Sequence, residues 1–250
     1  RTSKKSEGRK KKRKRLTSQK LIIVKNVKMI EPTDKIGRIT LYNADCMEVM
    51  KQYPDKYFDL AIVDPPYGIE RFKKCKQNDD INTKDVFANK FLNNEAFNNT
   101  KPTKKYWNEL FRISKNQIVF GANNFEMPPS EYFLIWDKKQ PMPNFARCEY
   151  AWVSMGLKTP AKVFDYSIHK HNHTDKIHPT QKPVALYAWI LKNYAKEGER
   201  ILDTHFGSLS IGIACEKLGF ELTAIELDKD YYRMAKQRLL DFKKQLTIEF

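Results

Sequence analysis

Short apolar runs alternate along the chain with amphipathic segments of helical period, and this alternation is typical of an α/β protein. The clearest run is Phe58–Val63, whose β-branched residues predict a buried strand that ends where Pro65 and Pro66 prevent further pairing. Shorter runs of the same kind predict strands over residues 21–24, 39–42, 117–120, 132–136, 150–153 and 162–164. Helical periodicity predicts helices over 45–50 and 103–114.

The C-terminal third has the most regular pattern. It predicts a helix over 183–194, a strand over 200–203, a helix over 210–218, a strand over 220–226 and a helix from 229 onward. This order makes a βαβ unit with a small-residue turn after its first strand and Glu226 at the end of its second. Such a unit suits a ligand that carries a nucleoside, because the turn allows close backbone approach and a carboxylate accepts from ribose hydroxyls. Leu209 occupies the position where a third glycine would bring helix and ligand closer.

The length of 250 residues and the apolar content of 41% fit one domain of α/β size, which we expect to span 21–250. Residues 69–100 are rich in Asn, Lys and Asp with little periodicity, and they predict a long excursion from the fold. No apolar run approaches the ~20 residues that cross a bilayer, and no signal peptide is visible. We therefore expect a soluble, cytoplasmic protein with no membrane partner.

The formal net charge is +16 and is unevenly spread. The first 20 residues hold eleven Lys and Arg against one Glu, so we expect residues 1–20 to be a disordered basic arm. Such an arm adds sequence-independent phosphate contacts whose benefit falls with salt. The alternative is a solvated tail with no such role. The remaining residues are also basic in sum.

Asp64, Pro65, Pro66 and Tyr67 form the most informative turn, because they follow a buried strand directly. In open α/β sheets ligands bind at the carboxyl ends of strands. A carboxylate, a rigid turn and an aromatic ring at that edge therefore make a candidate catalytic site. A lone Asp-Pro-Pro-Tyr is also a common strand-ending turn, so the motif needs support from the rest of the chain.

That support is a resemblance of three ordered motifs to a known family. Asp-Pro-Pro-Tyr at 64–67, His-Pro-Thr-Gln-Lys-Pro at 178–183, and Asp-Thr-His-Phe-Gly-Ser at 203–208 with Glu226 resemble the β-class amino-methyltransferases that modify DNA at adenine N6. The similar region covers about residues 39 to 240. Short phage and mobile-element members look especially similar through Trp107-Asn108-Glu109 and Gly121-Ala122-Asn123.

The resemblance implies a doubly wound, mixed and mostly parallel sheet of the class I methyltransferase (Rossmann-like) type, with permuted motif order. It implies seven strands with one antiparallel hairpin, and it places the two functional turns side by side. It also implies S-adenosylmethionine as cofactor, double-stranded DNA as partner, and a restriction-modification or phage setting in a bacterial or phage-infected cell. Whether the protein is a monomer or a homodimer stays open.

The chemistry of the residues agrees with this resemblance. Adenine N6 is a poor nucleophile because its lone pair is delocalised, and the sulfonium methyl group is already electrophilic. The Asp64 carboxylate and the Pro65 carbonyl can accept from both N6 hydrogens, which is positioning plus electrostatic stabilisation. Tyr67 offers a face for an extruded base, and Pro66 stiffens the turn. A C5-cytosine enzyme needs a Pro-Cys dipeptide, and this chain has none.

The resemblance also assigns cofactor-binding residues. Asp45 and Cys46 would contact the adenine, Glu226 the ribose, Thr180, Gln181 and Lys182 the methionine end, with Asp203, Phe206, Gly207, Ser208 and Asp64 beside them. The family often has Asp-Pro-Phe-x-Gly-Ser-Gly-Thr here. This chain departs from it at Thr204, His205, Leu209 and Ser210, and the departures put cofactor affinity in doubt more than fold.

The residues leave three alternatives to adenine-N6 methylation of DNA open. Cytosine-N4 relatives usually carry Ser before Pro-Pro, so Asp64 favours adenine without excluding cytosine. A second alternative is a catalytically weak protein that binds nucleic acid as a partner. A third is methylation of RNA in place of DNA. The polar segments near 70–101 and 138–175 are the expected DNA-facing insertions.

A metal site has little support in the sequence. The alternating His169, His171 and His173 and the scattered cysteines lack the spacing of a zinc site, so we expect a polar DNA-facing segment and no metal. The four tryptophans, Trp107, Trp136, Trp152 and Trp189, fall on apolar faces and are expected in the core.

Overall fold

The computed structural model describes residues 29–68, 100–172 and 176–248. The basic arm, the strand predicted over 21–24 and most of the polar excursion lie outside the described residues. The chain divides into two units, Arg1–Glu31 and Pro32–Phe250, and the second contains every element discussed below. No helix in the described part is long and apolar enough to cross a membrane.

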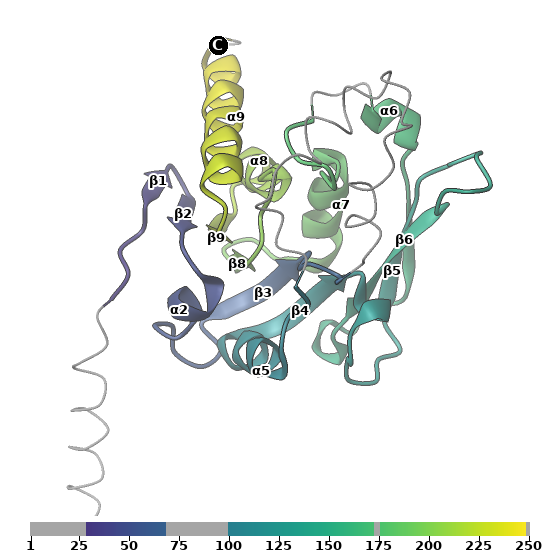
Figure 1. Ribbon diagram of the computed structural model, residues 1–250, viewed down its shortest axis with the longest axis horizontal. Helices are drawn as coiled ribbons and strands as arrows, with labels where there is room; N and C mark the ends of the chain where they lie inside the picture. Colours follow the sequence, from purple (N-terminus) through teal and green to yellow (C-terminus); the bar gives the residue numbers. More distant parts are fainter. Residues whose placement is uncertain (1–28, 69–99, 173–175, 249–250) are drawn as a thin grey trace, which may run out of the picture. The chain divides into compact units, whose positions relative to one another are not determined.

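The second unit is built on one nine-stranded sheet, counted over the described residues, in the order β1-β2-β9-β8-β3-β4-β6-β5-β7 (Figure 1). The strands are β1 (Asp34–Ile36), β2 (Ile39–Asn43), β3 (Phe58–Val63), β4 (Ser114–Phe120), β5 (Phe133–Asp137), β6 (Cys148–Val153), β7 (Lys162–Asp165), β8 (Arg200–Asp203) and β9 (Glu221–Glu226). Five neighbouring pairs are parallel and three are antiparallel. The mixed, mostly parallel sheet is confirmed, whereas the seven strands that the family resemblance implies are too few for the nine in the described residues.

Helices cover both faces of the sheet. They are α2 (Cys46–Met50), α5 (Lys104–Ile113), α6 (Ile168–Asn172), α7 (Val184–Tyr194), α8 (Ser210–Leu218) and α9 (Lys229–Ile248), with 3₁₀ turns η1 (Ala122–Asn124) and η2 (Met155–Leu157). In Figure 1, α2 and α5 lie on one face, and α7, α8 and α9 lie on the other. This is the doubly wound arrangement that the motifs predicted.

Local chemistry explains where the main helices begin. Asp45 caps α2 by accepting from the Met47 N–H at 2.7 Å. Pro183 is the N-cap of α7 and not its first helical residue, which corrects the predicted start by one position. Trp107, Trp136 and Trp152 are buried as expected, and Trp189 is partly buried against the same core.

The sheet brings three carboxyl ends together. β3 pairs in parallel with β8, and β8 pairs in parallel with β9, so the turns that follow them meet at one edge. Asp64 follows β3, Thr204 follows β8, and Glu226 ends β9. The expectation that the two functional turns lie side by side is confirmed.

Candidate active site

A cavity of about 1020 Å³ opens at this edge of the sheet. All but one of the residues that the sequence analysis placed in a site are part of its lining: Asp45, Cys46, Asp64, Pro65, Pro66, Tyr67, Thr180, Gln181, Lys182, Phe206, Gly207, Ser208 and Glu226. Asp203 is the exception, because it is fully buried behind the wall. Segments that are distant in the chain therefore converge on one cavity.

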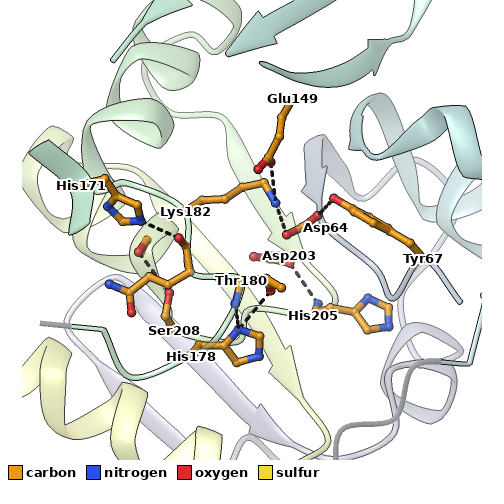
Figure 2. Close-up of polar contacts among 12 residues, drawn as sticks. Asp64, Tyr67, Glu149, His171, His178, Thr180, Lys182, Asp203, His205 and Ser208 are labelled. Carbon is orange, nitrogen blue, oxygen red and sulfur yellow. Dashed lines mark hydrogen bonds and ion pairs between the residues drawn. The ribbon is translucent and has the colours of Figure 1, made fainter. Parts of the chain in front are cut away.

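Asp64 has a hydrogen-bond partner on each carboxylate oxygen (Figure 2). The Tyr67 hydroxyl donates to Oδ1, and the Lys182 ammonium donates to Oδ2. Lys182 is almost fully buried, so its charge has to be paired within the protein. The pairing fixes the direction of the carboxylate at the end of β3.

Lys182 connects Asp64 to a second acid that the sequence analysis missed. Its Nζ lies 3.4 Å from Glu149 Oε2, and Glu149 Oε1 lies 2.9 Å from Lys138 Nζ. Burial alone would raise the pKa of Glu149, but Lys182 and Lys138 lower it below its ordinary value. Burial likewise opposes the charge on Lys182, and Asp64 in particular raises its pKa well above the usual range. The only sequence signal for Glu149 was an acidic residue beside an apolar run.

Tyr67 is held by close packing on its ring. Gly121 has φ +62°, and a Cβ at that position would lie 2.3 Å from two carbons of the Tyr67 ring. Glycine is therefore needed both for the backbone conformation and for the approach of the ring. The Tyr67 ring also meets Phe125 edge-on at 6.0 Å between centroids. Burial raises the pKa of the Tyr67 hydroxyl, which keeps it a donor.

Glu226 organises the loop after β8. Its Oε2 accepts from the Gly207 N–H at 2.9 Å, and its Oε1 accepts from the Asp228 N–H at 3.0 Å. Burial raises the pKa of Glu226 despite these bonds. Each oxygen keeps further lone-pair capacity, and Glu226 lines the cavity, as a site for vicinal hydroxyls requires.

Leu209 adopts the left-handed conformation at the N-cap of α8, with φ +55°. Its side chain is fully buried in the core, and it does not line the cavity. Gly212 makes room for it, because a Cβ on Gly212 would lie 2.7 Å from Leu209 Cγ. Leu209 thus takes the backbone conformation that glycine favours and directs its side chain away from the ligand space.

Thr204 and His205, which depart from the family pattern, belong to one series of polar side chains in contact with each other. Tyr106 Oη and Thr204 Oγ1 are 2.6 Å apart, Thr204 Oγ1 and His205 Nδ1 are 2.9 Å apart, and His205 Nε2 lies 4.0 Å from Cys46 Sγ. Burial lowers the pKa of His205 to about 4, so the ring is neutral at pH 7. These residues replace the family pattern with a different but mutually bonded set.

Asp203 is the most perturbed carboxyl group. Burial raises its pKa to about 8, and the charges of Asp64 and Glu226 add to the effect. Its Oδ1 accepts from the His205 N–H at 3.0 Å. Asp203 therefore holds the start of the loop from behind the cavity wall.

The segment 178–183 forms the opposite wall. The Gln181 carbonyl accepts from His171 Nε2 at 2.6 Å, and Gln181 Oε1 accepts from the Ile177 N–H at 3.1 Å. Burial lowers the pKa of His178 to about 4, and its ring packs 4.4 Å from that of Tyr231. Thr180 is exposed at the cavity rim.

His171 has a structural contact of its own. It is buried in α6, and its ring meets Trp136 edge-on at 6.0 Å. His169 is exposed, and His173 lies outside the described residues. Across the described ranges, His, Cys, Asp and Glu side chains form no group of three that could hold a metal ion. The expected polar, DNA-facing segment around these residues is thus partly an ordered helix.

The doubly wound sheet, the acidic turn after β3 and the small-residue loop after β8 define the class I methyltransferase architecture. Residues 149–237 match the DNA methylase family N6_N4_Mtase. The chain is 24% identical over 231 residues to the type II methyltransferase M.HpaI of Haemophilus parainfluenzae, covering 78% of this chain and 72% of that enzyme. It is 24% identical over 249 residues to the type II methyltransferase M.HinfI of Haemophilus influenzae, covering 82% and 69%.

Two solved structures share the fold. The M1.HpyAVI complex with S-adenosylmethionine matches with a TM-score of 0.50 and 20% identity, covering 80% of this chain and 99% of that chain. The cytosine-N4-specific PvuII DNA methyltransferase matches with a TM-score of 0.55 and 13% identity, covering 86% and 94%. The described sheet thus has the fold of these DNA methyltransferases, and residues 149–237 are similar to the N6/N4 DNA methylases.

The residues at the cavity fit a ligand of the S-adenosylmethionine type, which carries a nucleoside and an amino-acid end. Glu226 lines the cavity, where its carboxylate can accept from a ribose diol, and Gly207 beside it adds no side chain to the lining. The cavity is large enough for a nucleoside and an amino-acid moiety together. Its walls combine acids with Lys182 and backbone groups, which suits a zwitterion.

Proposed function

We propose that the chain methylates the N6 amino group of adenine in double-stranded DNA. One observation carries the proposal: the Asp64 carboxylate is held between Tyr67 and Lys182 at the end of β3. The same cavity is lined by Glu226 and by the loop after β8 that Glu226 binds. A nucleophilic amino group bonded to Asp64 would then lie beside a methyl donor held at that loop. This proximity replaces the strong base that a weakly nucleophilic amine would otherwise need.

Asp64 acts as an oriented acceptor in this proposal. One of its oxygens accepts from an N6 hydrogen, and the Pro65 carbonyl accepts from the other. The substrate amino group takes the place of the Tyr67 hydroxyl on Oδ1, while Lys182 continues to hold Oδ2. The two acceptors stabilise the positive charge that develops on nitrogen.

The methyl donor is placed by the other wall of the cavity. When bound, S-adenosylmethionine supplies an electrophilic methyl group on a sulfonium centre. Glu226 would bind the ribose hydroxyls, and Asp45 and Cys46 would lie at the adenine. The methionine end would meet the segment 180–182 and the loop at Phe206, Gly207 and Ser208, with Asp203 supporting that loop from behind.

Tyr67 would receive the extruded base. A base inside the duplex cannot reach the cavity, so it has to leave the stack. The ring of Tyr67 is fixed over Gly121 and against Phe125, which gives a rigid surface for stacking. The net charge of +16 supports binding to the phosphate backbone.

Cytosine N4 is the second candidate. The matched family covers both N6 and N4 enzymes, and one structure of similar fold is cytosine-N4-specific. Asp64 in place of Ser before Pro-Pro supports adenine. The similarity to two type II methyltransferases supports a role in restriction and modification, and the phage setting, the cytoplasmic location and the oligomeric state stay predictions.

The test is methyl transfer to unmethylated genomic DNA with a radiolabelled methyl donor, followed by nucleoside analysis. We expect label in N6-methyladenine. Label in N4-methylcytosine overturns the choice of base. No label, together with no cofactor binding by calorimetry, overturns the enzymatic proposal and favours a nucleic-acid-binding partner. RNA is assayed in parallel, and preferential labelling of RNA overturns the choice of substrate.

A further inference from the structure

The loop between β5 and β6 carries two exposed apolar side chains beside the catalytic cavity. Met142 is 55% exposed and Phe145 is 59% exposed. The Phe145 N–H donates to the Met142 carbonyl at 3.2 Å, so both residues belong to one turn. Figure 1 shows the loop extending beyond the ends of both strands. More than half of the surface of each side chain is left uncovered within the described residues, so both are available to contact a binding partner.

Phe145 also belongs to the cavity. It lines the same space as Asp64 and Tyr67 although more than half of its surface is exposed. The Phe145 ring therefore lies at the boundary between the cavity and its surroundings. A residue at this boundary is in place to act on a base that enters the site.

The backbone of the loop is stiff. Pro141 and Pro143 flank Met142 and fix the φ angle at two positions. The Lys138 N–H donates to the Arg147 carbonyl at 2.9 Å and closes the base of the loop. Little conformational entropy is left to lose when the apolar side chains are pushed against a partner.

The charge of the loop indicates what that partner is. Residues 138–147 contain Lys138, Lys139 and Arg147 and no acidic residue. Lys139 and Arg147 are exposed, and they share the carboxylate of Asp137 at 3.1 Å and 3.5 Å. Two exposed cations that flank an apolar turn match a duplex, which offers phosphates on either side of stacked bases.

We infer that Phe145, supported by Met142, is the apolar wedge that enters the base stack and stabilises the gap left by the extruded base. The inference rests on the proposed function and names the residue that performs the opening step. Apolar wedges of this kind offset the loss of stacking when a base leaves the duplex. Lys139 and Arg147 would hold the phosphates that flank the opened step.

The wedge is tested by comparing paired and unpaired targets. Methyl transfer is measured on a duplex with the enzyme's own site, as identified on genomic DNA, and on the same duplex with an abasic position opposite the target base. The variants are Phe145→Ala and Phe145→Leu in the full chain. Phe133→Ala is the matched control, since Phe133 is 38% exposed on β5 and lies outside both the cavity lining and the segment 138–175.

We expect Phe145→Ala to lower kcat/KM on the paired duplex by about tenfold or more and to recover most of that loss on the unpaired one. Phe145→Leu keeps apolar bulk and should lose less, and Phe133→Ala should match the wild type. An equal loss on both duplexes, or no loss, overturns the wedge while wild-type methylation leaves the proposed function standing. If the wild type methylates neither duplex, the proposed function fails and the wedge fails with it.

Discussion

The Lys182 ammonium is paired with the Asp64 carboxylate, although the two residues are 118 positions apart in the chain. Lys182 had been expected at the methionine end of the cofactor, whereas its ammonium bonds to Asp64 and Glu149. The segment 178–183 thus connects the proposed cofactor side of the cavity to the proposed catalytic turn at residues 64–67. A change at Lys182 should therefore alter catalysis and stability together.

Lys182→Met should lower both methyl transfer and stability. Its removal leaves Asp64 and Glu149 as like charges without their shared cation, which costs about 3 kcal/mol of unfolding free energy in a buried pair. It also frees the carboxylate to turn, so kcat should fall about 100-fold. Denaturant unfolding and single-turnover transfer measure the two effects.

The double variant Lys182→Met, Glu149→Gln separates charge from position. The added Glu149→Gln change removes the surplus negative charge that Lys182→Met leaves. We therefore expect most of the unfolding free energy to return while the rate of methyl transfer stays low. Recovery of both properties would mean that Lys182 only balances charge. Normal transfer in Lys182→Met alone would remove Lys182 from the catalytic turn.

Gly121→Ala should displace Tyr67. The new Cβ would lie 2.3 Å from the ring carbons, so the ring and its bond to Asp64 have to move. Gly198→Ala is the matched control, because Gly198 also has a positive φ but has open space around it. We expect about 1 kcal/mol of destabilisation in the control. Only Gly121→Ala should lose methyl transfer, by tenfold or more, and equal activity in the two variants would contradict this account.

Leu209 gives a test of strain against burial. Leu209→Ala keeps the left-handed backbone and loses the buried side chain, at a cost of about 3 kcal/mol. Leu209→Gly loses the same side chain but relieves about 1 kcal/mol of strain. Urea unfolding should therefore rank Leu209→Gly as more stable than Leu209→Ala and less stable than the wild type. Because Leu209 does not line the cavity, cofactor affinity should change little in either variant.

Asp203 should make stability fall with rising pH. Its pKa is about 8 in the folded protein against 3.8 as the reference, so the folded state keeps a proton that the unfolded chain loses. Its contribution is complete below about pH 4 and is lost as the pH rises to about 8. Asp203→Asn keeps an acceptor for the His205 N–H and cannot ionise. Over that range the unfolding free energy of the wild type should fall by several kcal/mol relative to that of this variant, at about 1.4 kcal/mol per pKa unit. Equal pH dependence of the unfolding free energy in the two proteins would contradict the prediction.

The sequence predicted the strands and helices that carry motifs because their apolar periods are long and their turns are chemically distinct. Each of these elements begins within one residue of its predicted start. β3, β8 and α8 begin at Phe58, Arg200 and Ser210, and α7 begins one residue after Pro183. β1 and α6 were missed because they are short and polar, so their pairing depends on neighbours and not on their own pattern. The lower strand count came from the family resemblance and not from the residues.

The site was predictable where its residues sit in motifs, and not where they act through space. Asp64, Tyr67 and Glu226 stand at strand ends, and the topology of parallel strands brings them together. Glu149 lies on antiparallel β6, and only the three-dimensional register places it beside Lys182. The position of Phe145 at the cavity was also not predictable, because the identity of an apolar loop residue does not tell whether its side chain is exposed.

The central claim is that the Asp64 carboxylate holds the target amino group. Asp64→Ala tests it most directly, with Asp230→Ala as an exposed control carboxylate on α9. Methyl transfer to adenine in duplex DNA is measured beside cofactor binding by calorimetry and cooperative unfolding. We predict that Asp64→Ala still folds and binds S-adenosylmethionine, and that its transfer falls at least about 100-fold. Wild-type turnover by Asp64→Ala would contradict the account.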